Sequence, residues 1–143
     1  MKTIAARELR TGRVRDVMQM HMVTVVPEMT VRELAQTLLD GGVRSAPVLG
    51  PTGKVVGIVT QAAVTRLAFA ALTDADAADP ADVLRVRDIM GPVGDTIAPD
   101  EALSTLVRRF LRGRENQLLV VDRGMLLGIV TPVDVLGAID AVL

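Results

Sequence analysis

The chain has 143 residues, which is the length of one ordinary domain or of two small units that share a core. Half of the residues are apolar, yet Phe69 and Phe110 are the only aromatic residues, so we expect a core of Val, Leu, Ile, Ala and Met. The 16 basic and 17 acidic residues nearly cancel and form no run of one sign, which argues against a nucleic-acid-binding surface.

The chain contains no cysteine, which excludes disulfides, thiolate zinc sites and cysteine nucleophiles. Its first ten residues lack the continuous apolar core of a signal peptide, and no segment approaches the ~20 apolar residues that a membrane-spanning helix needs. We therefore expect a soluble, cytoplasmic protein that has no membrane partner.

After a short basic lead-in, the sequence is organised as a repeat. Residues 14–18 read V-R-D-V-M, and residues 86–90 read V-R-D-I-M, 72 positions later. The same offset relates Thr24 to Thr96 and Pro27 to Pro99. The offset becomes 71 between Gly57 and Gly128, which indicates a one-residue deletion in a turn, where changes of length are tolerated.

Each repeat predicts the order β-α-β-β-α. A short strand over residues 24–26 ends at Pro27, and Thr30 with Glu33 then forms a capping box that begins a helix. The apolar positions of this helix follow a spacing of i, i+3, i+4, i+7 and i+8 in both repeats, which predicts one buried stripe. They are Val31, Leu34, Ala35, Leu38 and Leu39 in the first repeat and Leu103, Leu106, Val107, Phe110 and Leu111 in the second.

Two strands joined by a tight turn follow in each repeat, over residues 46–49 and 55–60 and over residues 118–121 and 125–131. A closing helix then runs from about residue 61 to 72, and from residue 132 to the end of the chain. Both closing helices are apolar on nearly all sides, and such a helix needs more than one partner surface. We therefore predict self-association into a homodimer.

The repeats are joined by an Ala/Asp-rich stretch that Pro80 interrupts, for which we predict a solvent-exposed connection. An acidic metal-binding loop is the alternative, but alternating Asp and Ala is not the ligand spacing of a calcium loop. We predict repeat 1 over residues 14–72, the connection over 73–85 and repeat 2 over 86–143. The predicted fold class is α/β (α+β), with two pseudo-symmetric repeats in one compact pair.

A strand-to-helix turn recurs within the repeats, as G-I-V-T-Q-A-A from Gly57 and as G-I-V-T-P-V-D from Gly128. Thr131 and Asp134 have the spacing of a helix-start box, and Pro132 occupies the favoured first helical position. Only the second copy keeps an acid, because Ala63 occupies the equivalent position in the first.

The doubled series R-D-[VI]-M, T-h-x-P, amphipathic helix and h-G-I-V-T resembles a tandem pair of cystathionine-β-synthase (CBS) domains over almost the whole chain. The resemblance implies a compact pair in which two three-stranded sheets meet about a pseudo-two-fold axis, with two clefts between the repeats. Such pairs commonly bind adenosine-containing ligands, form dimers and regulate an attached enzyme or transporter. No such partner domain is evident in this sequence, so a separate effector protein is expected.

In this family the threonine and aspartate of G-h-h-T-x-x-D hold a ribose, which implies that role for Thr131 and Asp134. An ionised carboxylate offers two oxygens to two adjacent hydroxyl groups. The same residues fit a helix cap, and both interpretations stay open. With Ala63 in the first copy, we expect at most one good nucleoside site in each chain.

The resemblance also places adenine contacts at Val23 and Thr24, with Val43 and Arg44 nearby. Phosphate contacts map to Asn116 and Gln117, which are uncharged, so the charge for a phosphate is expected from Arg44, with Arg112 or Arg114 as possible neighbours. The low fixed positive charge favours a monophosphate or an uncharged-tail adenosine over a triphosphate. The candidate ligands are therefore AMP, ADP, ATP, S-adenosylmethionine and NAD, with an AMP-like molecule favoured and no cofactor required.

Catalytic and metal sites find little support in the sequence. Ser45 and Ser104 are the only serines, and neither stands in the context of an activated nucleophile. His21 lies between two methionines, an arrangement that favours packing over a copper site. We therefore predict no enzyme and no metal, but a regulatory ligand sensor; a ligand-independent dimerisation or scaffold module is the alternative.

Overall fold

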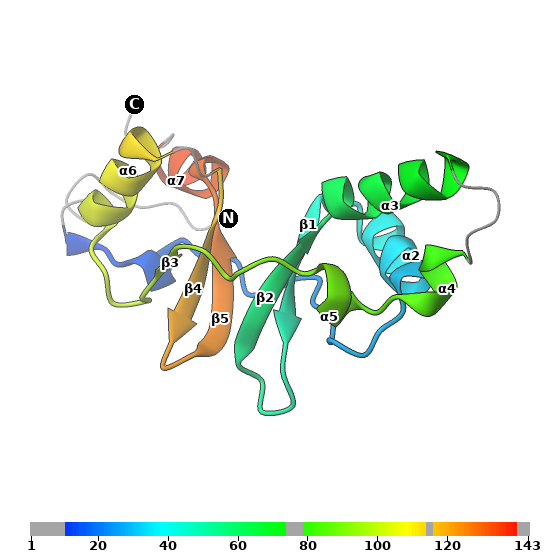
Figure 1. Cartoon of the computed structure of the whole chain (residues 1–143). Helices are drawn as coiled ribbons and strands as arrows, with labels where there is room; N and C mark the ends of the chain where they lie inside the picture. Colours follow the sequence, from blue (N-terminus) through cyan, green and yellow to red (C-terminus); the bar gives the residue numbers. More distant parts are fainter. Residues whose placement is uncertain (1–10, 74–78, 114–115, 140–143) are drawn as a thin grey trace. The chain divides into compact units, whose positions relative to one another are not determined.

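The computed structural model describes residues 11–73, 79–113 and 116–139 (Figure 1). The chain divides into two compact units, of which unit 1 is Met1–Met22 with Gly94–Leu143 and unit 2 is Val23–Val93. Each unit is a small α/β body, as the sequence predicts for the fold class. The units differ from the sequence repeats, because each contains the body of one repeat and the opening segment of the other.

Unit 1 shows the predicted order of elements, and unit 2 shows it without the first strand. In the part of the chain that the structure describes, unit 2 contains α2 (Val31–Gly41), β1 (Ser45–Leu49), β2 (Val55–Thr60), α3 (Gln61–Thr73), α4 (Pro80–Val83) and α5 (Val86–Ile89). Unit 1 contains η1 (Val14–Asp16), β3 (Thr96–Ile97), α6 (Leu103–Arg112), β4 (Leu118–Asp122), β5 (Met125–Val130) and α7 (Pro132–Ile139).

The two sheets differ in their first strand. In unit 1, β3 pairs parallel with β4, and β4 pairs antiparallel with β5. In unit 2, β1 and β2 form an antiparallel pair, and the predicted strand over residues 24–26 is reduced to one parallel bridge between Val25 and Val48. In the same register Thr24 would lie opposite Pro47, and this pairing would need a backbone N–H that proline lacks. The equivalent residues of unit 1, Thr96 and Leu119, do pair.

The hairpin turn of unit 1 explains the missing residue of the second repeat. Asp122 pairs with Met125, so the turn has only two central residues, Arg123 and Gly124. Both have positive φ, at 53° and 83°, as the two-residue turns that match strand twist require.

Helices α2 and α6 show most of the predicted stripe, and α2 begins after Thr30 as predicted. The Oγ1 atom of Thr30 accepts a hydrogen bond from the N–H of Glu33 at 3.1 Å, which caps α2 as expected. Leu34 and Leu106 are fully buried at equivalent positions. The last member of each stripe was predicted wrongly, since Leu39 is 74% exposed and Leu111 is 80% exposed.

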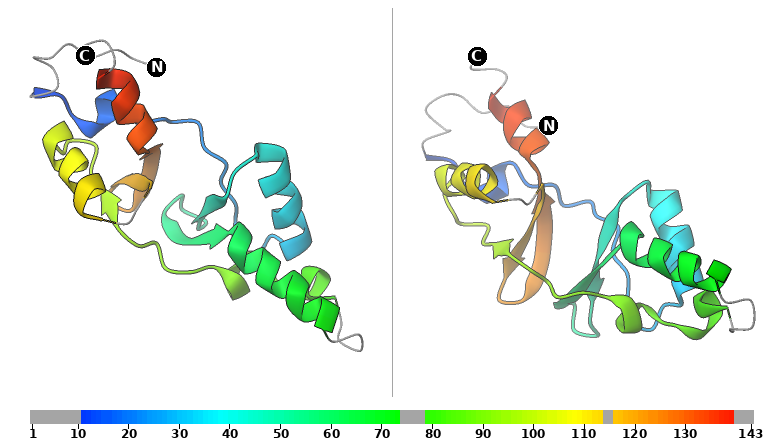
Figure 2. Two further views of the ribbon diagram at one scale, coloured as in Figure 1. Left: turned by 90° about the horizontal axis from the view of Figure 1, so that it is seen from above. Right: turned by 45° about the horizontal axis from the view of Figure 1, so that its top comes forward.

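The opening segment of each repeat packs on the body of the other repeat. The N–H of Val14 donates to the carbonyl of Glu101, and Val14 is buried with Leu103 and Leu106 in the core of unit 1. Figures 1 and 2 show this blue segment beside α6. In unit 2 the N–H of Val86 donates to the carbonyl of Met29, and Val86 is buried in that core.

Part of the predicted connection is structured. Residues 74–78 lie outside the described residues, but α4 follows them and is bonded to α2. Nε of Arg32 donates to Asp82 at 2.7 Å, and Nη2 donates to Asp79 at 2.7 Å. All three side chains are exposed, in agreement with the solvent-exposed connection that the sequence predicts.

Both cores are aliphatic, as the composition predicts. The buried side chains are Val, Leu, Ile and Ala, and Phe110 packs against the core of unit 1 only partly buried. Among the described helices, none has the combination of length and apolar character that crossing a bilayer requires.

Candidate functional site

Asp134 is the one polar or charged side chain that is buried in the described part of the chain, with 1% of its surface exposed. It lies in the first turn of α7, where β5 ends at Val130 and Pro132 begins the helix. The strand-to-helix turn therefore places a carboxylate inside unit 1. A buried carboxylate needs hydrogen-bond donors, because leaving it unpaired costs several kcal/mol.

Both oxygens of this carboxylate have donors. Oδ2 accepts the backbone N–H of Thr131 at 2.8 Å and the hydroxyl of Thr131 at 3.1 Å. Oδ1 accepts a hydrogen bond from Nε2 of Gln19 at 2.5 Å. The helix-start arrangement that the spacing predicts is therefore present, since the acid three residues into the turn accepts the N–H that precedes the helix. The ribose role of Thr131 and Asp134 stays a prediction.

Gln19 reaches Asp134 from the opening segment, and its backbone is held by β5. Its N–H donates to the carbonyl of Ile129, and its carbonyl accepts the N–H of Ile129, both at 2.9 Å. Gly128 makes this approach possible, because a Cβ there would lie 2.8 Å from the carbonyl oxygen of Gln19 and 3.0 Å from Sδ of Met18.

Sequence reasoning missed Gln19, whose partner lies 115 positions away. A signal was nevertheless present in the repeat. At the offset of 72, Gly91 is equivalent to Gln19, and at the offset of 71, Ala63 is equivalent to Asp134. Ala63 and Gly91 both belong to unit 2, so the unit that lacks the acid also lacks the amide that would bond to it.

The equivalent turn of unit 2 forms the same backbone arrangement without a carboxylate. Gly91 and Ile58 exchange backbone hydrogen bonds at 2.8 and 3.1 Å. Oγ1 of Thr60 accepts the N–H of Ala63 at 3.1 Å and so serves as a helix cap. Ala63 gives this turn no carboxylate, and that the first copy is a poor nucleoside site stays a prediction.

The other predicted ligand residues are divided between the units. Asn116 and Gln117 belong to unit 1 with Thr131 and Asp134, whereas Val23, Thr24, Val43 and Arg44 belong to unit 2. Val23 and Val43 pack against the core of unit 2, and Arg44 is exposed. The carbonyls of Arg44 and Val43 accept hydrogen bonds from the N–H and the side-chain amide of Gln61, at 2.8 and 2.9 Å. Arg114 lies outside the described residues.

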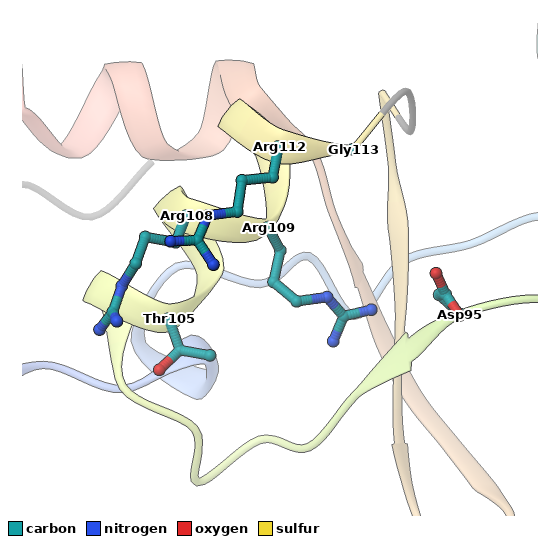
Figure 3. A pocket seen from close by; sticks show the side chains of 6 residues that line it. All are labelled: Asp95, Thr105, Arg108, Arg109, Arg112 and Gly113. Carbon is teal, nitrogen blue, oxygen red and sulfur yellow. The ribbon is translucent and has the colours of Figure 1, made fainter.

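A separate pocket of about 350 Å³ lies along α6 in unit 1 (Figure 3). It is lined by Asp95, Thr105, Arg108, Arg109, Arg112 and Gly113. Arg112 was predicted as a possible neighbour of the phosphate, and none of the other residues predicted to contact the ligand lines this pocket. Nη1 of Arg109 donates to the carbonyl of Thr96 at 2.9 Å, which ties α6 to β3. Arg109 therefore has a structural partner, and Arg108 and Arg112 are exposed.

The fold and this strand-to-helix turn define a class of paired α/β modules. The family model of the CBS domain matches the chain twice, over residues 14–69 and 86–141, and the chain belongs to this family. The resemblance drawn from the repeated motifs is thereby confirmed.

Two proteins show how widely this module is shared. Protein MJ1225 of Methanocaldococcus jannaschii is 27% identical over 121 residues, which are 85% of this chain and 40% of that protein. The A-adding tRNA nucleotidyltransferase of Aquifex aeolicus is 25% identical over 139 residues, which are 97% of this chain and 16% of that enzyme. The chain thus spans less than half the length of these relatives.

Solved structures share the fold over nearly the whole chain. The CBS domain of a CBS-domain-containing membrane protein from Sphaerobacter thermophilus has a TM-score of 0.73 and 27% identity, with 93% of this chain and 91% of that chain covered. The complex of CBSX2 with AMP also has a TM-score of 0.73, with 25% identity and coverage of 91% and 97%.

Proposed function

We propose that this chain is a regulatory module that binds one adenosine-containing nucleotide, preferably AMP-like, at Asp134 and signals to a separate effector protein. The observation that carries the proposal is the buried carboxylate of Asp134 at the turn after β5, in a family whose member CBSX2 has been crystallised with AMP. The carboxylate would accept the two ribose hydroxyls, and the Thr131 hydroxyl would add a third contact. We also propose that the chain is not an enzyme.

Binding at Asp134 would signal only if it favours one arrangement of the protein over another. The turn offers such a coupling, since Asp134 is bonded both to the start of α7 and to the opening segment through Gln19. A ligand that binds this carboxylate would replace the side-chain contact between the opening segment and the turn that begins α7.

Calorimetric titration with AMP, ADP, ATP, S-adenosylmethionine and NAD tests the proposal. We expect one site in each chain, the tightest binding for AMP, and a loss of about 10- to 100-fold in affinity for Asp134→Asn. The substitution keeps the volume and one carbonyl acceptor but removes the charge and one acceptor, and hydrogen bonds to a charged acceptor are worth about 1.5–3 kcal/mol each.

Asp88→Asn is the matched control. Oδ2 of Asp88 accepts the N–H of Arg85 at 2.8 Å, so this variant also removes a carboxylate that caps a turn, but in unit 2. AMP affinity should stay at the wild-type value. The proposal would be contradicted if the wild type binds no ligand of the panel at millimolar concentration, or if Asp134→Asn binds AMP as tightly as the wild type.

A ligand-independent dimerisation or scaffold module is the second candidate. It is favoured by Val133 and Leu136, which are 64% and 62% exposed on α7. Under this proposal the Asp134 carboxylate has the structural role that its hydrogen bonds to Thr131 describe, and dimers form equally with and without nucleotide. Native mass spectrometry with and without AMP separates the two candidates.

A further inference from the structure

An exposed amide covers the buried carboxylate of the proposed nucleotide site. Asp134 is buried, whereas Gln19, whose side chain donates to Oδ1, belongs to the exposed residues of unit 1. The donors to Oδ2 come from Thr131, which is part of the same turn as Asp134. Gln19 is thus the donor that can leave without any change in the strand-to-helix turn.

Only the side chain of Gln19 is free to move. Its backbone N–H and carbonyl are both bonded to Ile129, and the contact at Gly128 leaves no space between the segment and β5. Exposure of Oδ1 therefore needs a rotation about side-chain bonds and no unfolding of the opening segment, and such rotations take place in ps to ns at a protein surface.

The other unit supplies an internal comparison. Its Gly91 makes the same pair of backbone hydrogen bonds, to Ile58, so the backbone arrangement does not require a glutamine. Gly91 faces a turn that has Ala63 in place of the acid. The amide side chain is present only where there is a carboxylate to receive it.

We propose that Gln19 is a built-in competitor for the nucleoside, which covers Asp134 in the empty protein and which a ligand must displace; this inference rests on the proposed function. Displacement removes one N–H donor from the carboxylate. A ribose with free 2′- and 3′-hydroxyls supplies two donors, whereas a 2′-deoxyribose supplies one and only replaces what is lost. With the cover in place, only a ligand with a vicinal diol gains a donor to the carboxylate on binding.

Removal of the cover should strengthen binding. In Gln19→Ala a ligand no longer has to displace the Gln19 amide from Oδ1 of Asp134. We therefore expect AMP and 2′-deoxy-AMP each to bind this variant about tenfold more tightly than they bind the wild type. In the wild type, 2′-deoxy-AMP should bind at least about tenfold more weakly than AMP. Calorimetry with these two ligands gives the four affinities.

Gln36→Ala is the matched control, because Nε2 of Gln36 donates to Oδ1 of Asp40 at 2.7 Å on the surface of α2. It removes the same kind of hydrogen bond at a place with no proposed ligand, and both affinities should stay at the wild-type values. A second readout is the side-chain ¹⁵N–H₂ signal of Gln19, which should shift on addition of AMP while that of Gln36 does not.

The outcomes separate this inference from the proposed function. If the wild type binds AMP and Asp134→Asn does not, but Gln19→Ala binds AMP no more tightly than the wild type, Gln19 is no competitor and the proposed function stands. If neither the wild type nor Gln19→Ala binds any ligand of the panel, the proposed function and this inference fail together.

Discussion

Two methionine–glycine contacts explain the motif R-D-[VI]-M, which is repeated at residues 15–18 and 87–90. Met18 lies against Gly128, and Met90 lies against Gly57, where a Cβ would come within 3.0 and 2.8 Å of the methionine sulfur. The aspartates of this motif cap their own turns, since Asp16 and Asp88 each accept a hydrogen bond at 2.8 Å from the backbone N–H of the residue three positions earlier. R-D-[VI]-M is thus a docking segment for the h-G-I-V-T strand of the other repeat.

We predict that Gly128→Ala lowers the free energy of unfolding by about 1–3 kcal/mol, because overpacking against a fixed backbone carbonyl forces a shift. The new methyl group would meet the carbonyl oxygen of Gln19 at 2.8 Å. Urea denaturation followed by circular dichroism measures the loss.

Gly91→Ala is the control, because the nearest atom to its new methyl group is the carbonyl oxygen of Ile58 at 3.9 Å. Its stability should stay within about 0.5 kcal/mol of the wild type. Equal stability of Gly128→Ala and the wild type would show that the opening segment does not approach β5 as closely as described.

The residues of the candidate site were predictable where their signal is local. Thr131 and Asp134 follow from a spacing of three residues at a strand-to-helix turn, and the structure forms the corresponding hydrogen bonds. Gln19 has no local pattern, because its partner lies in another part of the chain. Only a comparison of both paired positions between the repeats, Gln19 with Asp134 and Gly91 with Ala63, points to it.

At the scale of elements, the short helix α4 is held on α2 by charge. Arg32 donates to both Asp79 and Asp82, and its hydrogen bond and charge lower the pKa of the Asp82 carboxyl below the ordinary value of 3.8. The same partners raise the pKa of Arg32. Because the pKa of Asp82 is lower in the folded protein, this contribution to stability is present above pH 3.8 and is lost as the pH falls through the folded pKa.

We predict that Arg32→Gln returns the pKa of Asp82 to its ordinary value, as measured by the ¹³C shift of its carboxyl group during a pH titration. Arg66→Gln is the control, since Arg66 is an exposed arginine on α3 with no described ion pair, and it should leave the titration unchanged. Added salt should weaken the wild-type shift, because both side chains are exposed. A titration of Asp82 that is the same in the wild type and Arg32→Gln would refute the pairing.

The elements themselves were largely predictable, and the differences have physical causes. Helical periodicity and the cap at Thr30 placed α2 correctly. Periodicity could not show that Leu39 and Leu111 face solvent. It gives the direction of a side chain from the helix but not how far the packed core extends along that helix. The first strand of unit 2 is shortened by Pro47, whose effect depends on a pairing register that the sequence does not state.

At the scale of the whole molecule, neither repeat can complete its core alone. The core of unit 2 contains Val86 from the second repeat, and the core of unit 1 contains Val14 from the first. Both valines are fully buried at equivalent positions of the opening segments. This exchange links the stability of each unit to the presence of both repeats, which local patterns could not reveal because they describe each repeat by itself.

The exposed apolar residues of α7 favour the predicted homodimer. Val133 and Leu136 are three positions apart and therefore lie on one face of the helix, with 64% and 62% of their surfaces exposed. A second copy of the chain would bury this face. We predict that the double variant Val133→Ser and Leu136→Ser is monomeric at concentrations at which native mass spectrometry detects wild-type dimers.

Val56→Ser is the control, because Val56 is also an exposed apolar residue but lies on β2. It should leave the dimer intact. Neither substituted position of α7 belongs to the aliphatic core of unit 1, so the thermal unfolding of the double variant should not become less cooperative. If the double variant stays dimeric, α7 is not the contact; if the wild type is monomeric, the prediction of self-association from the apolar closing helices is wrong.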